Sequence, residues 1–173
     1  MHLATPVPMR GSAGIRLSFQ LMLASKAEAE RKRPHMTGYQ IFWPLLAHVA
    51  LVYGLYALLG LRRAKMVRAG GIAKSDYREN RSEPAESLVV KNCLANQFEL
   101  PVLFHVCCIL LYITDADNIV TVGLAWAFVV LRYAHAAVHV TSNELRYRSP
   151  LFAAGYAVLA AMWIWLAVWM AIG

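Results

Sequence analysis

The stretch SLVVKNCLANQFELPVLFHVCCILLYIT, residues Ser87–Thr114, is long and apolar enough to cross a bilayer, yet its first half carries several polar side chains. A transmembrane helix needs about 20 mostly apolar residues. At about 100° per residue, Asn92, Asn96 and Glu99 fall on one stripe of such a helix. Because an ionisable group is costly in hydrocarbon, the stripe is expected to face protein, ligand or water. Pro101 removes a helical hydrogen bond and predicts a kink.

The whole chain has the composition of a multi-span membrane protein. Of its 173 residues, 59% are hydrophobic, whereas soluble domains are about half apolar. None of the apolar blocks alternates with the period of two expected of a membrane barrel strand. We therefore expect an all-α fold, with one domain at residues 36–173 that forms a membrane four-helix bundle. Its spans are predicted at 39–61, 88–113, 119–140 and 151–172.

Residues 1–35 differ from the rest of the chain. They combine prolines and glycines with a short apolar piece at 15–24 and a charged run at 26–33. A signal peptide is disfavoured because the denser charge follows the apolar piece. We expect a disordered or non-native extension. A surface-lying amphipathic helix over 15–33 and a translation start at Met36 both remain open.

Other features of the spans predict contacts between helices. His48, in the first span, is expected to hydrogen-bond to another helix. Cys93, Cys107 and Cys108 all lie in the second span and are read as small apolar packing residues. The short acidic segment 114–118 predicts a tight hairpin between antiparallel helices.

The third span carries Arg132, His135 and His139 on one helical face. Such a face is costly in an apolar span unless it serves a polar cavity. Structural pairing, for example of Arg132 with Glu99, is an alternative. Two histidines four residues apart can also hold a metal, but no third ligand is apparent and we expect no metal.

The turn before the fourth span carries Arg146 and Arg148. Ser149 is predicted to be the N-cap of the last helix and Pro150 its first residue. A cation beside a helix N-terminus is a place where a carboxylate can bind.

Basic residues in the loops predict the orientation of the bundle. The loop after the first span begins with Arg62 and Arg63 and is rich in Lys and Arg, whereas segment 114–118 has neither. The positive-inside rule therefore places the first and third loops in the cytoplasm and the termini on the opposite side. The basic residues before Met36 argue the other way. The net charge of +7 is mostly topological, and no basic-aromatic stripe indicates a nucleic-acid partner.

Together these motifs resemble the MAPEG family, the membrane-associated proteins of eicosanoid and glutathione metabolism, from about Tyr39 to the C-terminus. Arg62-Arg63 matches a basic pair after the first span of that family. Asn96, Glu99 and Pro101 match its Asn-x-x-Glu motif followed closely by Pro. The third span of its prostaglandin E synthase branch has Arg-x-x-His-x-x-x-Tyr and, nine residues beyond the Tyr, Arg-Ser. The matching residues here are Arg132, His135, His139 and Arg148-Ser149.

The resemblance implies a homotrimer with sites between protomers, and a glutathione transferase or peroxidase that acts on lipophilic electrophiles from the bilayer. Glutathione would be the co-substrate, and conjugation, reduction and isomerisation stay open. Arg148 and Ser149 would be catalytic, because a guanidinium favours a thiolate. The residues that would bind the peptide are Arg62, Arg63, Lys91, Asn96, Glu99, Arg132, His135 and His139.

Two departures from the family pattern support a different function. Asn92 stands where glutathione-binding members usually have Arg, which weakens glutathione binding. His139 stands where the third-span pattern has Tyr. The alternatives are therefore a non-catalytic lipid-binding or scaffold protein of the same fold, or an unrelated four-span transporter component.

Overall fold

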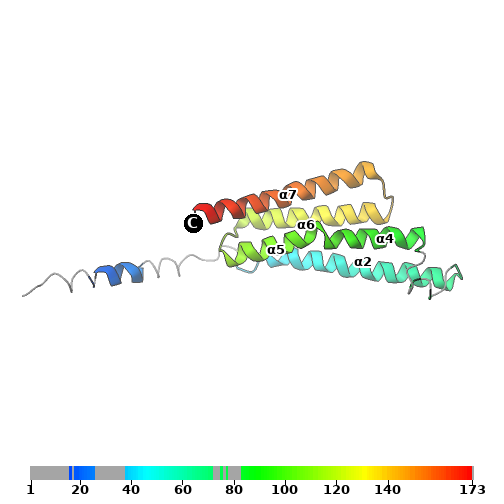
Figure 1. Ribbon diagram of the computed structural model, residues 1–173, viewed down its shortest axis with the longest axis horizontal. Coiled ribbons are helices and arrows are strands. Elements are labelled where there is room, and N and C mark those ends of the chain that lie inside the picture. The colour runs from blue at the N-terminus through cyan, green and yellow to red at the C-terminus, as the bar shows by residue number, and fades with distance from the viewer. Residues whose placement is uncertain are drawn as a thin grey trace, which may run out of the picture. The chain divides into compact units, whose positions relative to one another are not determined.

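The computed structural model describes residues 16, 18–25, 38–71, 75, 77 and 83–172 (Figure 1). The chain divides into two units, Met1–Met36 and Thr37–Gly173. In the first unit, residues 18–25 are helical with exposed side chains. The rest of the helix considered over 15–33, and of the extension, lies outside the described residues.

The second unit is built from helices, as the sequence predicts. They are α2 (Phe42–Arg68), α4 (Ala85–Ala95), the 3₁₀ turn η1 (Asn96–Phe98), α5 (Leu100–Ile113), α6 (Ile119–Val140) and α7 (Leu145–Ile172). In Figure 1 these segments run lengthwise beside one another, and α4, η1 and α5 together form one long broken helix. In the part of the chain that the structure describes, four helical stretches are long and apolar enough to cross a membrane: α2, the α4–α5 stretch, α6 and α7.

The short connection between α5 and α6 is fixed by local signals on both sides. Asp115 adopts a left-handed backbone (φ 53°), and the N–H of Ala116 donates to the Leu111 carbonyl at 2.9 Å, which closes α5. Asn118 then caps α6 by accepting hydrogen bonds from the N–H groups of Val120 and Thr121. The predicted tight hairpin is confirmed, and it lies at the opposite end of the bundle from the α6–α7 connection (Figure 1).

The start of the last helix differs from the prediction. The helix begins at Leu145, and the Glu144 carbonyl accepts hydrogen bonds from the N–H groups of Tyr147 and Arg148. Ser149 is therefore not the N-cap, and Pro150 lies inside the helix. Pro150 is the sixth residue of the helix and has no N–H, so the Arg146 carbonyl lacks its helical hydrogen-bond partner. As a result, Arg148 and Ser149 lie on a helical turn rather than at the helix N-terminus.

Apolar side chains from α5, α6 and α7 fill the largest core. The rings of Phe104 and Phe128 stack with centroids 4.4 Å apart, beside the buried Met162 and Leu166. A second cluster joins α2 to α4 and includes Cys93. All three cysteines are free and buried, which confirms their assignment as packing residues.

Candidate functional site

The polar stripe of the second span is interrupted where the helix breaks. Residues 96–98 form a 3₁₀ turn, and Glu99 has backbone angles outside the helical region (φ −98°, ψ −106°). The kink expected near Pro101 is thus confirmed. A 3₁₀ turn advances about 120° per residue and an α-helix about 100°, so the break changes the direction in which the following side chains point. Asn96 is half-buried, whereas Asn92 and Glu99 are exposed on the single chain.

Gln97 is the polar residue that the break turns inward. Its side chain is buried, with 2% of the residue exposed. The amide Nε2 donates to the Cys93 carbonyl at 3.0 Å, and Oε1 lies 3.2 Å from His48 Nε2 on α2. The interhelical hydrogen bond expected of His48 is confirmed. Edge-on contact of the His48 ring with His105, at 5.0 Å between centroids, extends the polar group.

A small cavity gathers four of the predicted site residues. It has a volume of about 270 Å³ and is lined by Asn96, His135, Arg148, Ser149 and Phe152. Asn96 comes from the break, and His135 comes from α6. The other three lining residues belong to α7. The Arg148 guanidinium is oriented by a hydrogen bond to Asn143 Oδ1 at 2.5 Å. The cavity therefore combines one permanent cation, a hydroxyl, an amide and an imidazole.

The Arg-His-His face of α6 is buried as expected. The exposed fractions of Arg132, His135 and His139 are 0%, 2% and 3%. The Arg132 guanidinium lies over the Phe152 ring, 5.0 Å from its centroid, and donates to the Phe152 carbonyl at 3.4 Å. Phe152 thus contacts both Arg132 and the cavity.

The suggested ion pair between Arg132 and Glu99 is not present among the described residues. Two Arg132 nitrogens, Nε and Nη1, are buried without a hydrogen-bond partner, and Glu99 is exposed. The described part of the chain also holds no group of three His, Cys, Asp or Glu side chains placed to bind a metal.

Arg62 joins three helices. Its Nη1 donates to the Glu86 carbonyl at 2.7 Å, and its Nη2 donates to the Val140 carbonyl at 2.8 Å. Val140 is the last residue of α6, where carbonyls lack helical partners, and Glu86 lies in the first turn of α4. In this chain Arg62 therefore serves the packing of α2 against α4 and α6.

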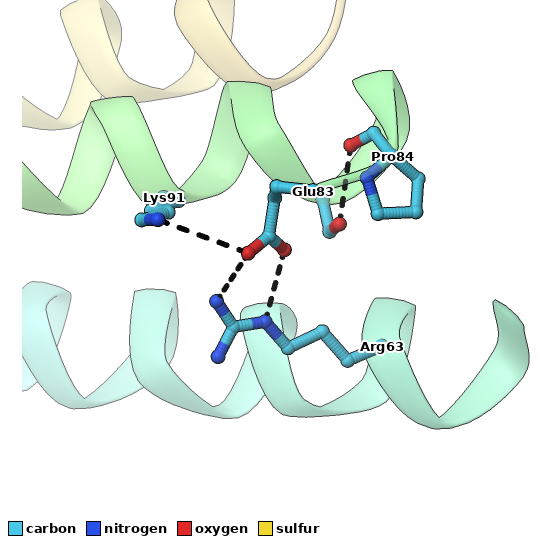
Figure 2. A network of polar contacts seen from close by, with 5 residues as sticks. Arg63, Glu83, Pro84 and Lys91 are labelled. Atoms are coloured by element: carbon cyan, nitrogen blue, oxygen red, sulfur yellow. Dashed lines mark hydrogen bonds and ion pairs between the residues drawn. The ribbon is translucent and has the colours of Figure 1, made fainter. Parts of the chain in front are cut away.

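Arg63 forms a bidentate pair with Glu83 at the same end of the bundle (Figure 2). The distances are 3.0 Å from Nε to Oε1 and 2.6 Å from Nη2 to Oε2, and Lys91 Nζ lies 3.9 Å from Oε2. The hydrogen bonds from Arg63 hold the pKa of the Glu83 carboxyl below its usual range. Ser87 and Lys91 act in the same direction, and burial opposes them. None of these residues lines the cavity.

A comparison of the amino-acid sequence with known protein families agrees with the order of these motifs on four apolar helices. Residues 41–168, more than half of the chain, match the sequence profile of the MAPEG family. The chain belongs to the MAPEG family. It is accordingly a multi-pass membrane protein, and a four-span transporter component unrelated to the MAPEG family is set aside. No curated protein and no solved structure gives a significant match.

Sequence reasoning missed three residues of this MAPEG bundle. Phe152 follows Arg148 by four positions, so helical periodicity across Pro150 would have placed both on one face. Glu83 precedes Pro84 at the start of a span, and no sequence pattern indicates that it pairs with Arg63. Gln97 is polar, but regular α-helical geometry turns its side chain away from the stripe that contains Asn96.

Proposed function

We propose that this MAPEG protein is a glutathione-dependent transferase or peroxidase that acts on lipophilic electrophiles. The observation that carries the proposal is the shared cavity of Asn96, His135, Arg148 and Ser149. These residues come from three separate segments of the chain, and each matches a position of the family motifs.

The chemistry assigned to the cavity is stabilisation of a thiolate. A free thiol has a pKa of about 8.5 and is mostly protonated at neutral pH. A guanidinium nearby favours the charged form, and each unit by which the thiol pKa falls corresponds to about 1.4 kcal/mol. Arg148 is the permanent cation in the cavity lining, and the Ser149 hydroxyl would donate a hydrogen bond to the same sulfur. Asn96 and His135 would orient the rest of the peptide.

A second chain is needed to complete such a site. The cavity of about 270 Å³ falls just below the usual range for small-molecule sites, about 300–1,000 Å³. Asn92 and Glu99 are exposed on the single chain within a membrane-spanning stretch, where contact with lipid is costly. Both observations support a homotrimer in which a neighbouring protomer covers this face, and they make Glu99 available to glutathione between protomers. A lipophilic electrophile would enter from the bilayer.

The remaining predicted peptide-binding residues play smaller parts in this proposal. Arg62, Arg63 and Lys91 all contact groups of the chain itself, so they would attract the peptide's carboxylates through the positive charge that they give this end of the bundle. Arg132 and His139 lie behind the cavity and would act through Phe152 and His135, respectively.

The test is the ultraviolet absorbance of glutathione thiolate against pH, with purified protein at saturating glutathione. For Arg148→Ala we expect the midpoint to move to higher pH, toward about 8.5, while the peptide stays bound. Arg146→Ala is the matched control, because this residue is two positions earlier in α7 and does not line the cavity. Superimposable curves for wild type and Arg148→Ala would rule out Arg148 as the activator.

A second candidate function is a non-catalytic lipid-binding or scaffold protein of the same fold. Asn92 in place of the usual Arg favours it, as does the engagement of Arg62 and Arg63 by the chain itself. Calorimetric titration of the wild type with glutathione separates the two functions, because the scaffold requires no glutathione binding.

A further inference from the structure

Two side chains of the break in the second span contact the first span. Gln97 donates to the Cys93 carbonyl one turn earlier, and its Oε1 lies 3.2 Å from His48 Nε2 on α2. The Phe98 ring lies edge-on to Tyr56 of α2, at 6.4 Å between centroids. The side chains of Gln97 and His48 are buried, with 2% of Gln97 and 0% of His48 exposed. Buried polar groups without partners are costly, so the two hydrogen bonds of Gln97 favour one conformation of the break.

The residues next to this link belong to the proposed site. Asn96 immediately precedes Gln97 and lines the cavity, and Glu99 follows it by two positions. Reversion of the break to a regular α-helix would change both the 3₁₀ turn and the non-helical backbone of Glu99, and would therefore rotate Asn96 relative to Glu99 and α5. Such a rotation would change the position of the Asn96 amide relative to His135 and Arg148. The orientation of the site therefore depends on what holds the break.

We propose that His48 and Gln97 are positioning residues that fix the α4–α5 break and thereby aim Asn96 and Glu99 at bound glutathione. This inference rests on the proposed function. Neither residue lines the cavity, so both act through the backbone of residues 96–99. Arg148, which lies on α7, keeps its place when the link is cut.

The first measurement is glutathione affinity by calorimetry for His48→Leu, Gln97→Met and the double variant. Each single variant is expected to weaken the Kd about five-fold, the equivalent of one lost hydrogen bond. The double variant is expected to be no weaker than either single one, because both substitutions cut the same link. The thiolate midpoint should stay at the wild-type pH. Cys107→Ala, which trims a buried residue of α5 outside the link, is the control for general destabilisation and should leave the Kd unchanged.

The second measurement needs no glutathione. Backbone amides of residues 96–100 are expected to exchange hydrogen faster in His48→Leu and Gln97→Met than in wild type, and not in Cys107→Ala. If Gln97→Met does not assemble, Gln97→Glu replaces it, because Glu keeps an oxygen for His48 and loses only the donor to Cys93.

Equal exchange at residues 96–100 in wild type and variants overturns the positioning role. An unchanged Kd in the variants, when the wild type binds glutathione, overturns it too. A wild type that fails to bind glutathione overturns the proposed function, and the exchange data then decide the role of the link alone.

Discussion

Arg132 carries a positive charge in the interior of the bundle, where two aromatic rings lie against its guanidinium group. The guanidinium lies between the rings of Phe128 and Phe152, 5.3 and 5.0 Å from their centroids. Such contacts are worth about 2 kcal/mol when desolvated. Gly155 on α7 leaves the necessary space, because a Cβ there would lie 2.6 Å from Arg132 Nη2.

Gly155→Ala is therefore expected to lower the thermal midpoint of unfolding. The added methyl forces a fully buried guanidinium to move between two rings, and overpacking of this kind costs about 1–3 kcal/mol. The control is Gly123→Ala on α6, where a Cβ would meet nothing within 4 Å and the better helix propensity of Ala is expected to be neutral or stabilising. Equal midpoints for the two variants would mean that Arg132 adjusts without cost.

The ion pair between Arg63 and Glu83 links the last turns of α2 to the segment just before α4. Glu83 lies just before α4 and receives both hydrogen bonds from Arg63 near the end of α2. Its side chain is 8% exposed and that of Arg63 is 35% exposed, so solvent screens the pair only in part. The pair holds together the end of the bundle that carries the cavity.

The depressed pKa of Glu83 predicts how this end of the bundle responds to acid. Because the folded-state pKa lies below the usual value of 4.5, the stabilisation is fully present above that value and is lost as pH falls through the folded pKa. Thermal midpoints measured from neutral to acidic pH should therefore fall more steeply for wild type than for Glu83→Gln. Parallel pH profiles would contradict a stabilising role of the Arg63–Glu83 pair.

The two ends of the bundle differ in the side chains that they carry. Arg62, the Arg63–Glu83 pair and the cavity lie at the end where α2 finishes and α7 begins. At the other end, the indole N–H groups of Trp165 and Trp169 donate to the Ala116 and Thr114 carbonyls at 2.9 and 3.0 Å. The indoles thus fix the α5–α6 hairpin to α7, in addition to the interface role that tryptophans near span ends commonly have.

The basic first loop predicts that the cavity end faces the cytoplasm, with or without residues 1–35. Labelling by a membrane-impermeant thiol reagent tests this, because the native cysteines are buried. In intact cells Asp115→Cys should be labelled and Ser142→Cys should not, both in the full chain and in a chain that starts at Met36. A reversed pattern in the shortened chain would show that residues 1–35 set the orientation. It would contradict their interpretation as a disordered or non-native extension.

The amino-acid sequence was enough to predict four apolar helices, the hairpin at 114–118 and the position of Arg132, His135 and His139 on one helical face. These follow from the length of the apolar blocks and from helical periodicity, which are local properties of the chain. The remaining features came from the tertiary structure, including the cavity lined by Asn96, His135, Arg148 and Ser149. The 3₁₀ turn at 96–98 interrupts the polar stripe and lets Gln97 lie buried against His48. The hydrogen bonds of Gln97 to His48 and to the Cys93 carbonyl offset the cost of burying an amide in an apolar interior. Arg62 and Arg63 satisfy carbonyls and a carboxylate of neighbouring segments, and such long-range pairing leaves no periodic trace in the sequence.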